Sequence, residues 1–212
     1  VLFLDEFPEF RKDTLEALRQ PIEDGFVTIT RASARSTYPA QFMLVAAMNP
    51  CPCGNYGSRI TPCRCTAQQI QRYRNRISGP MLDRIDIHVE MGEVGYNDIA
   101  GRSCGEPSSA IRARVNAARA IQTRRYAGMG ILFNAQLTNR MMNQYCVLTS
   151  DAESLMKKAF AALKLSARAY TRLLKVSRTI ADLAGSEQIK AEHIAEAIQY
   201  RSLESKYWGE IR

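Results

Sequence analysis

Two short apolar runs, each ending abruptly in polar residues, constrain the fold of this chain most strongly. Residues 1–4 are fully apolar and stop at Asp5-Glu6, and a second apolar run within residues 41–47 stops at Met48-Asn49-Pro50. Continuous apolar runs of this length are typical of strands buried in a parallel sheet, which emerge at a polar edge. The sequence therefore predicts two buried strands whose ends carry an acidic pair and an asparagine.

Other short elements surround these strands in the first hundred residues. A helix is expected over 10–20, ending at Pro21, and a second over 67–76, capped by Thr66 and stopped at Ser78-Gly79-Pro80. Residues 50–65 contain Gly, Pro and four Cys, which indicates a loop. β-Branched or alternating patterns predict a hairpin of 26–30 with 35–39 and a third strand over 86–90.

From residue 108 onward the pattern is helical throughout. Helices are predicted over 111–126, 139–146, 150–163, 166–183 and 190–201, the third opened by a capping box from Ser150 to Glu153 and the fourth closed by Gly185. The stretch 92–109 is rich in Gly and Ser and is typical of a linker. We therefore predict an α/β domain over 1–95, a linker over 96–107 and an all-α domain over 108–212.

Composition excludes several classes of protein. The chain has 212 residues, is 46% hydrophobic and 24% charged, and contains no apolar run near the roughly 20 residues needed to cross a bilayer. No secretory signal pattern opens it, so we expect a cytoplasmic protein without a membrane span. The apolar start without Met suggests a fragment of a longer protein.

The net charge of +8 lies entirely in the second half. Residues 1–100 hold 11 basic and 12 acidic residues, whereas residues 101–212 hold 18 and 9. A basic module of this kind is typical of a surface that meets nucleic acid, the alternative being a solvated helical surface.

The polar strand ends point to phosphate chemistry. In enzymes that hydrolyse nucleotides, one carboxylate of an acidic pair holds Mg²⁺ and the next polarises the attacking water. An amide such as that of Asn49 can orient that water, although Asn-Pro also opens turns. Arg84 lies just before the third predicted strand and either offsets phosphoryl charge in a neighbouring subunit or pairs locally with Asp83 or Asp86.

The combination of motifs resembles a known family. Leu4-Asp5-Glu6, Ala46-Ala47-Met48-Asn49-Pro50 and Gly79-Pro80-Met81-Leu82-Asp83-Arg84-Ile85-Asp86 resemble the AAA+ ATPases. With Leu18-Arg19-Gln20-Pro21-Ile22-Glu23-Asp24-Gly25 and Asn49-Pro50-Cys51-Pro52-Cys53-Gly54, they look like the bacterial magnesium-chelatase-like proteins of the ComM/YifB type, close to the MCM helicases. The resemblance implies an AAA+ core followed by a helical lid, working with ATP and Mg²⁺ in a ring, expected to be a hexamer.

The resemblance also implies roles for matching residues. Asp5 and Glu6 correspond to the Walker B pair, with Asp5 for Mg²⁺ and Glu6 as catalytic base. Asn49 corresponds to sensor 1 and Arg84 to the arginine finger acting on the next subunit. Arg168, within Leu165-Ser166-Ala167-Arg168-Ala169-Tyr170, corresponds to sensor 2 and would lie near the γ-phosphate.

One expected motif is absent from the chain. No Gly-rich loop ends in G-K-[S/T], the Walker A signature that binds phosphate. In the family this loop precedes the Walker B strand, so the chain corresponds to a partial core. We therefore expect these 212 residues alone to hydrolyse no nucleotide.

Four cysteines form a candidate metal site. Cys51, Cys53, Cys63 and Cys65 make two Cys-x-Cys pairs separated by nine residues. Four thiolates suit structural Zn²⁺, although this spacing is tighter than the usual Cys-x₂-Cys. Zinc would fix the loop after Asn49, and free or oxidised thiols are the alternative.

Three groups of basic residues are candidates for contacts with phosphate or DNA. On the helix that begins at Ser166, Arg168, Arg172, Lys175 and Arg178 share one face. The resemblance to inserts of related ring helicases implies that Arg31 and Arg35 of the hairpin face a central pore, a subunit interface in the ring being the alternative. Arginines interleaved with Tyr73 suit nucleic acid or a subunit interface: Arg59, Arg64, Arg72, Arg74 and Arg76.

The favoured function is an AAA+ motor that couples ATP hydrolysis to remodelling of DNA, by branch migration or helicase-like movement. One alternative is a magnesium-chelatase-type motor subunit that remodels a protein partner. Another is a non-catalytic, zinc-containing module that binds nucleic acid. His88 and His193, the only histidines, have no partners at a catalytic spacing and receive no role.

Overall fold

The chain folds into two compact units. The computed structural model describes residues 1–31, 34–94 and 105–208, with side chains up to Arg201. Unit 1 comprises residues 1–85 and, from the end of the chain, the residues that begin at Tyr207 near the end of the last helix. Unit 2 comprises Asp86–Lys206. Most of the expected linker, residues 96–104, lies outside the described residues.

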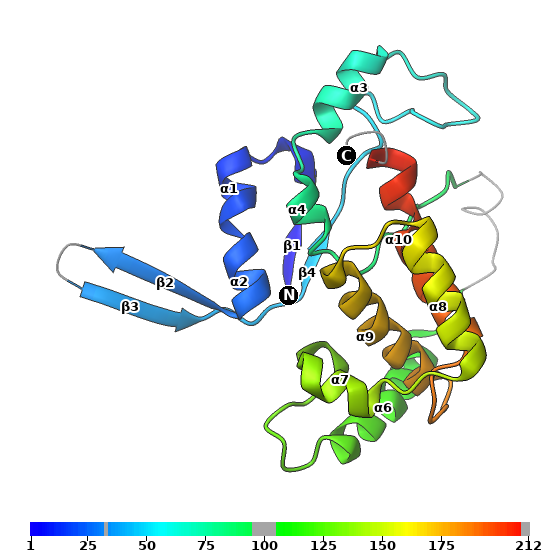
Figure 1. The fold of residues 1–212 in the computed structure, drawn as a ribbon. Helices are drawn as coiled ribbons and strands as arrows, with labels where there is room; N and C mark the ends of the chain where they lie inside the picture. Colours follow the sequence, from blue (N-terminus) through cyan, green and yellow to red (C-terminus); the bar gives the residue numbers. More distant parts are fainter. Residues whose placement is uncertain (32–33, 95–104, 209–212) are drawn as a thin grey trace. The chain divides into compact units, whose positions relative to one another are not determined.

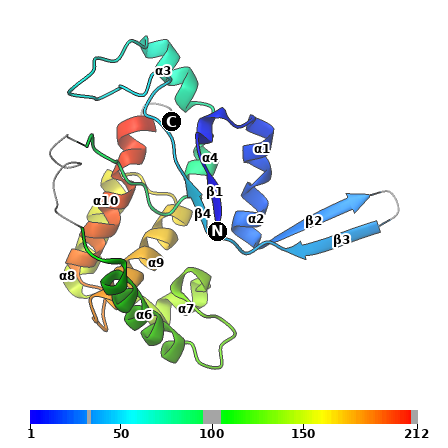
Figure 2. The same ribbon diagram turned by 180° about the vertical axis from the view of Figure 1, so that it is seen from behind.

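Unit 1 contains a two-stranded parallel sheet. Strands β1 (Leu2–Leu4) and β4 (Leu44–Ala46) pair in the register Leu2↔Leu44 and Leu4↔Ala46, and they lie side by side in Figures 1 and 2. The prediction of paired strands is confirmed, but the prediction that both are buried is wrong, because every residue of the two strands is at least partly exposed. Phe3 is 59% exposed and Val45 40%, because successive side chains alternate and no described element covers their side of the sheet.

Two short helices follow β1 where one was predicted. After a 3₁₀ turn, η1 (Phe7–Glu9), α1 (Lys12–Ala17) and α2 (Arg19–Asp24) meet at Leu18. Pro21 was expected to end the helix, but it is the third residue of α2, where a backbone N–H would have no helical acceptor. Helix α2 ends at Gly25, whose left-handed φ of 73° favours glycine.

The predicted hairpin is confirmed. Strands β2 (Phe26–Arg31) and β3 (Ala34–Pro39) pair antiparallel and extend away from α2 (Figure 1). Thr30 lies opposite Arg35 and Arg31 lies opposite Ala34. Because directly opposite residues share a face and successive residues alternate, Arg31 and Arg35 point to opposite faces of the hairpin.

The rest of unit 1 is a cysteine-containing loop and two helices. Helix α3 (Ala67–Arg74) begins with the expected cap, Thr66, which makes a reciprocal capping box with Gln69. The sequence predicted that this helix extends to residue 76 and is stopped at Ser78, but it ends earlier, at Arg74, with Asn75 as its C-cap. Ser78 instead caps the next helix, α4 (Gly79–Leu82). A small apolar core joins α4 and the residue Ile77 before it to α1 and η1: Phe7, Leu15, Ile77, Met81 and Leu82.

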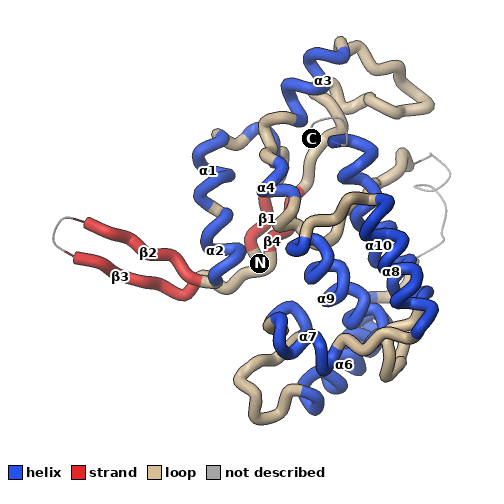
Figure 3. The backbone as a smooth tube through the Cα atoms, in the orientation of Figure 1, coloured by secondary structure: helices blue, strands red, loops and turns tan. Residues whose placement is uncertain are grey.

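Unit 2 is helical, as predicted (Figure 3). Its helices are α6 (Ser108–Arg125), α7 (Asn139–Tyr145), α8 (Ser150–Ala162), α9 (Ala167–Leu183) and α10 (Ala191–Trp208), with a 3₁₀ turn η2 (Asn134–Gln136). Their core includes Tyr126, Leu137, Met142, Met156, Leu173, Ile180, Ile189 and Ile194.

Two details of unit 2 differ from the sequence prediction. The cap of α8 is Thr149, whose hydroxyl accepts from the Ala152 N–H at 3.4 Å, so the capping box expected from Ser150 is wrong. The third strand expected over 86–90 is also wrong. Residues 86–90 form no regular strand, and the backbone N–H of His88 donates at 2.8 Å to the Tyr200 carbonyl of α10, a helix.

Candidate nucleotide site and metal centre

The acidic pair and Asn49 leave the sheet at the same edge. Strands β1 and β4 run parallel, and the Ala47 N–H donates to the Leu4 carbonyl at 2.9 Å. Asp5-Glu6 follows the end of β1, and Met48-Asn49 follows β4. Both acids and Asn49 are exposed to solvent, so their side chains are accessible to a ligand.

Glu6 adopts an unusual backbone conformation. Its φ and ψ are 50° and 44°, in the left-handed region that residues with a Cβ rarely occupy. The Glu6 N–H donates to Oδ1 of Asp5 at 2.9 Å, which helps to hold this turn. Strained backbone of this kind is concentrated at functional sites. Exposed carboxylate oxygens are also the ligands that Mg²⁺ prefers, so the residues present fit that ion.

The loop over residues 50–65, called the Cys loop, packs close to Asn49. A Cβ added at Gly54 would lie 4.0 Å from Oδ1 of Asn49, so the loop backbone passes close to this amide. The Asn49 backbone also hydrogen-bonds the Tyr73 hydroxyl, whose pKa is raised mainly by burial. Arg74 donates to the Pro50 carbonyl at 3.4 Å. Asn49 is therefore held between the loop and α3.

The four predicted cysteines converge. Their Sγ atoms all lie within 4.8 Å of one another, and Cys51 is fully buried. Sγ of Cys51 lies 3.4 Å from that of Cys53 and 3.7 Å from that of Cys63, and the Cys53–Cys63 separation is 3.6 Å. A tetrahedral zinc with Zn–S bonds of about 2.3 Å separates its sulfurs by about 3.8 Å. The cluster therefore has the size and chemistry of a zinc site.

The electrostatics of the cluster are those of a cation site. Backbone hydrogen bonds from Arg64 and Asn55 lower the pKa of Cys53 to about 6, which favours its thiolate at neutral pH. Burial and the neighbouring sulfurs raise the pKa of Cys65 to about 12. A bound cation offsets the repulsion between neighbouring thiolates and lowers the pKa of each ligand.

Arg84 is held inside unit 1. It is 8% exposed, forms an ion pair with Glu23 of α2, and donates to the Pro80 carbonyl at 2.6 Å. Of the two local partners considered from the sequence, Asp86 pairs instead with Arg172. Glu23 was missed because it lies 61 residues away, and no sequence pattern connects it to Arg84.

The basic residues of α9 divide into two kinds. Arg168 is exposed at the start of the helix. Arg172 pairs with Asp86 at 2.7 Å, and Lys175 donates to the Ala135 carbonyl at 2.9 Å. Arg178 is 1% exposed and donates to Asp182 and to two carbonyls. Most of the basic residues that the spacing placed on one face of α9 therefore stabilise the fold. Arg168 is the one whose side chain is exposed and accessible to phosphate.

The basic residues of unit 1 also separate. Arg72 is exposed, whereas Arg74 is buried and stacks over the Tyr56 ring at 4.6 Å from its centroid. Arg74 thereby fixes the Cys loop to α3. Arg31 and Arg35 are both exposed on the hairpin.

Comparisons with known proteins identify the family. The family model described as magnesium chelatase, subunit ChlI, matches residues 1–99, and that of the ChlI C-terminal region matches residues 105–201. The chain belongs to the magnesium chelatase family. These domains have the AAA+ fold, which agrees with the helical unit that follows the strand-containing unit.

Individual relatives extend this result. The chain is 47% identical over 204 residues to competence protein ComM of Haemophilus influenzae and 44% identical over 205 residues to the uncharacterized protein YifB of Salmonella typhimurium. These matches cover 96% of the chain but 39% of each relative, so the chain spans well under half their length. It is 22% identical over 209 residues, 94% of the chain and 24% of the relative, to zygotic DNA replication licensing factor mcm6-A of Xenopus laevis.

No helix in the described part of the chain is both long and apolar enough to span a membrane.

Proposed function

We propose that this chain is part of an AAA+ motor that couples ATP hydrolysis to remodelling of DNA. The observation that carries the proposal is the shared sheet edge, where Asp5, Glu6 and Asn49 follow two parallel strands. Carboxyl ends of parallel strands are where α/β sheets bind ligands. The chain holds no G-K-[S/T] loop, so hydrolysis is proposed for a longer protein that supplies one.

Each residue has a role in this proposal. Asp5 holds Mg²⁺, which when bound neutralises charge on the phosphate oxygens. Glu6 accepts a proton from the attacking water, and the Asn49 amide orients that water. Arg168, exposed at the start of α9, contacts the γ-phosphate.

Arg84 acts on the site of the next subunit in a ring. Its guanidinium is occupied by Glu23 and the Pro80 carbonyl. In the proposal, the γ-phosphate of a neighbour competes with Glu23 for this cation. Mixing subunits that carry Arg84→Lys with subunits that carry Glu6→Gln tests the role. In a mixed ring, some interfaces combine an intact Glu6 from the first kind of subunit with an intact Arg84 from the second. Recovery of hydrolysis supports action in trans, and its absence contradicts it.

DNA is the proposed partner because the unit that carries the candidate nucleotide site also carries exposed arginines. Arg31, Arg35 and Arg72 are exposed, and the names of ComM and of the replication factor associate those relatives with competence and DNA replication. The Cys loop, with zinc bound by its four cysteines, would fix the region around Asn49. A motor that remodels a protein partner would need neither feature.

Hydrolysis of ATP by the full-length protein, with and without forked DNA, tests the proposal. Glu6→Gln should lower the rate by about a hundredfold or more, since a general base contributes about 10²–10⁴, while ATP and DNA still bind. Glu153→Gln, an exposed glutamate of α8, is the matched control. Normal hydrolysis by Glu6→Gln would overturn the catalytic assignment. Failure of DNA to bind or stimulate would overturn the DNA assignment in favour of a protein partner.

A further inference from the structure

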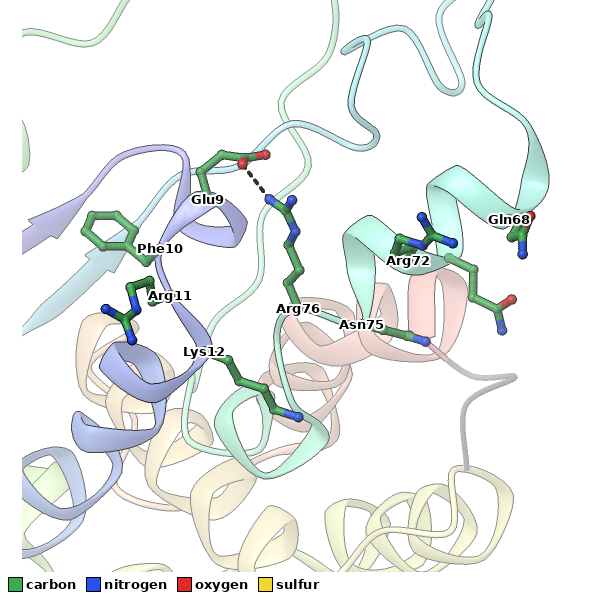
Figure 4. A pocket seen from close by; sticks show the side chains of 9 residues that line it. Glu9, Phe10, Arg11, Lys12, Gln68, Arg72, Asn75 and Arg76 are labelled. Atoms are coloured by element: carbon green, nitrogen blue, oxygen red, sulfur yellow. Dashed lines mark hydrogen bonds and ion pairs between the residues drawn. The ribbon is translucent and has the colours of Figure 1, made fainter.

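A basic cleft in unit 1 is unused by the proposed nucleotide chemistry. It lies between the start of α1 and the exposed side of α3, and its volume is about 640 Å³. Figure 4 shows Lys12 reaching in from α1 while Arg72 and Asn75 line the side formed by α3. This volume is in the range of about 300–1,000 Å³ that is usual for sites that hold a small ligand.

The cleft carries an excess of positive charge. Arg11, Lys12, Arg72 and Arg76 line it together with one carboxylate, Glu9. Arg76 forms an ion pair with Glu9 and also donates to the Pro8 carbonyl at 3.2 Å, so the carboxylate is already neutralised. The remaining cations therefore define the field inside the cleft.

Two of these cations are not committed to the fold. Lys12 and Arg72 are both exposed. The pKa of Glu16 is lowered mainly by hydrogen bonds from Ser78 and Arg19, and Lys12 adds only a weaker attraction to that carboxylate. Arg11 pairs with Asp13 at 3.6 Å, but both side chains are at least 85% exposed, so this contact is worth little. Arg74 shows the opposite arrangement, since it is buried on Pro50 and Tyr56.

Arg72 lies in the last turn of α3, and Arg76 lies just beyond the end of that helix. Because Arg76 is already paired with Glu9, Lys12 and Arg72 are the main cations left to contact an anion. The cleft thus holds exposed cations around an open space, which is the arrangement expected of a site for a polyanion.

An aromatic ring distinguishes among polyanions. Phe10 lines the same cleft and is 38% exposed. Exposed rings beside cations bind single-stranded nucleic acid, because bases stack on the ring while cations contact the phosphates. An acidic protein segment would use the cations but would gain nothing from the ring. A duplex keeps its bases stacked on one another and offers none to Phe10.

We propose that this cleft binds a short stretch of single-stranded DNA, with Lys12 and Arg72 on the phosphates and Phe10 against a base. The inference deepens the proposed function, on which it rests, by placing a strand contact outside the hairpin. Arg11 contributes to the field, and the Arg76–Glu9 pair closes one side of the cleft.

Binding of fluorescein-labelled thymidine oligonucleotide to the full-length protein tests the inference. Lys12→Glu and Arg72→Glu should each weaken binding by about fivefold to tenfold and reduce the dependence of log affinity on log salt by about one. Phe10→Leu keeps an apolar side chain but removes the ring, and should weaken binding by about fivefold or more. Lys158→Glu and Arg124→Glu, exposed in unit 2, are matched charge controls.

Competitors identify the ligand. Poly-glutamate should compete poorly and should be insensitive to Phe10→Leu, and MgATP should not displace the oligonucleotide. Equal weakening by the control variants, equal competition by poly-glutamate, or displacement by MgATP would each overturn the inference.

The result is separable from the proposed function, because ATP hydrolysis is measured in the same preparations. If the oligonucleotide binds through the cleft but the protein hydrolyses no ATP, the inference is supported and the proposed motor function is contradicted. If DNA stimulates hydrolysis and none of the three cleft variants changes that stimulation, the motor function is supported and the inference is contradicted.

Discussion

Helices α3 and α9 both carry basic residues at helical spacing, but they use them in opposite ways. In α9, Arg178 is buried against Asp182 and the carbonyls after the helix. In the last turn of α3, by contrast, Arg72 is exposed on an open cleft. Arg76, just beyond that helix, resembles Arg178, since it is held by Glu9 and the Pro8 carbonyl. What separates Arg72 from Arg178 is whether the rest of the fold brings an acid and free carbonyls to the same face.

The two units also differ in how they are stabilised. Unit 2 has a larger apolar core that encloses an ion network, in which Asp182 accepts from Arg125, Arg178 and Asn134. Unit 1 has a small core of five buried residues beside the cysteine cluster. We therefore expect unit 2 to depend on a buried carboxylate and unit 1 on a bound metal.

Removing the charge of Asp182 should produce the largest effect. Burial opposes its ionisation, but hydrogen bonds from Arg125 and Asn134 outweigh burial and lower its pKa. Asp182→Asn leaves two guanidinium groups without a buried counter-charge, which should cost about 3–5 kcal/mol. Hydrogen exchange of α9 and α6 measures this loss. Glu153→Gln, which breaks an exposed pair with Lys157, should cost less than about 0.5 kcal/mol. Similar losses in both variants would contradict a special role for the network.

Metal removal should have the next largest effect, confined to unit 1. Free zinc at about one hundred times its Kd stabilises the state that binds it by about 2.7 kcal/mol. Chelation, or Cys51→Ser, should therefore raise exchange in the loop and α3 by about a hundredfold and leave α9 unchanged. Zinc content is measured on protein purified without oxygen. Less than about a tenth of an equivalent in the wild type would refute the zinc site.

Local features were predicted better than non-local ones, although the cap of α8 was placed one residue late, at Ser150 instead of Thr149. The cap at Thr66, the hairpin and the convergence of the cysteines all depend on residues close in the chain. The pairing of Arg84 with Glu23 depends on contacts that no local pattern encodes. The strand expected over 86–90 failed for the same reason, since alternation was present but no strand among the described residues pairs with it. The roles of Asp5, Glu6, Asn49 and Arg168 remain predictions.

His193 should make unit 2 sensitive to mild acid. Its ring is buried, and Nδ1 accepts from the Lys190 N–H at 3.0 Å, which caps the start of α10. Burial lowers its pKa, and nearby Lys190 and Arg178 act in the same direction against Glu192 and Glu196.

Because the folded pKa lies below the unfolded one, the unfolded chain binds the proton more readily. Stability of unit 2 should therefore fall as pH drops through about 6.5 and level off below the folded pKa. His193→Gln should remove this pH dependence at a cost of about 1 kcal/mol at pH 7.5. An unchanged pH profile in this variant would assign the dependence to another group.

The smallest effect contrasts Lys164 and Glu6, the two non-glycine residues with positive φ in the described part of the chain. Lys164 (φ 48°) follows α8, where the Leu165 N–H returns to the Phe160 carbonyl, and Glu6 (φ 50°) follows β1. A left-handed residue after a helix is usually glycine, so Lys164→Gly should stabilise unit 2 by about 0.5–1 kcal/mol and leave hydrolysis unchanged. Glu6→Gly should relieve similar strain but abolish hydrolysis. If Lys164→Gly also lowered hydrolysis, strain near Arg168 would belong to the mechanism, and the two positions would be alike rather than different.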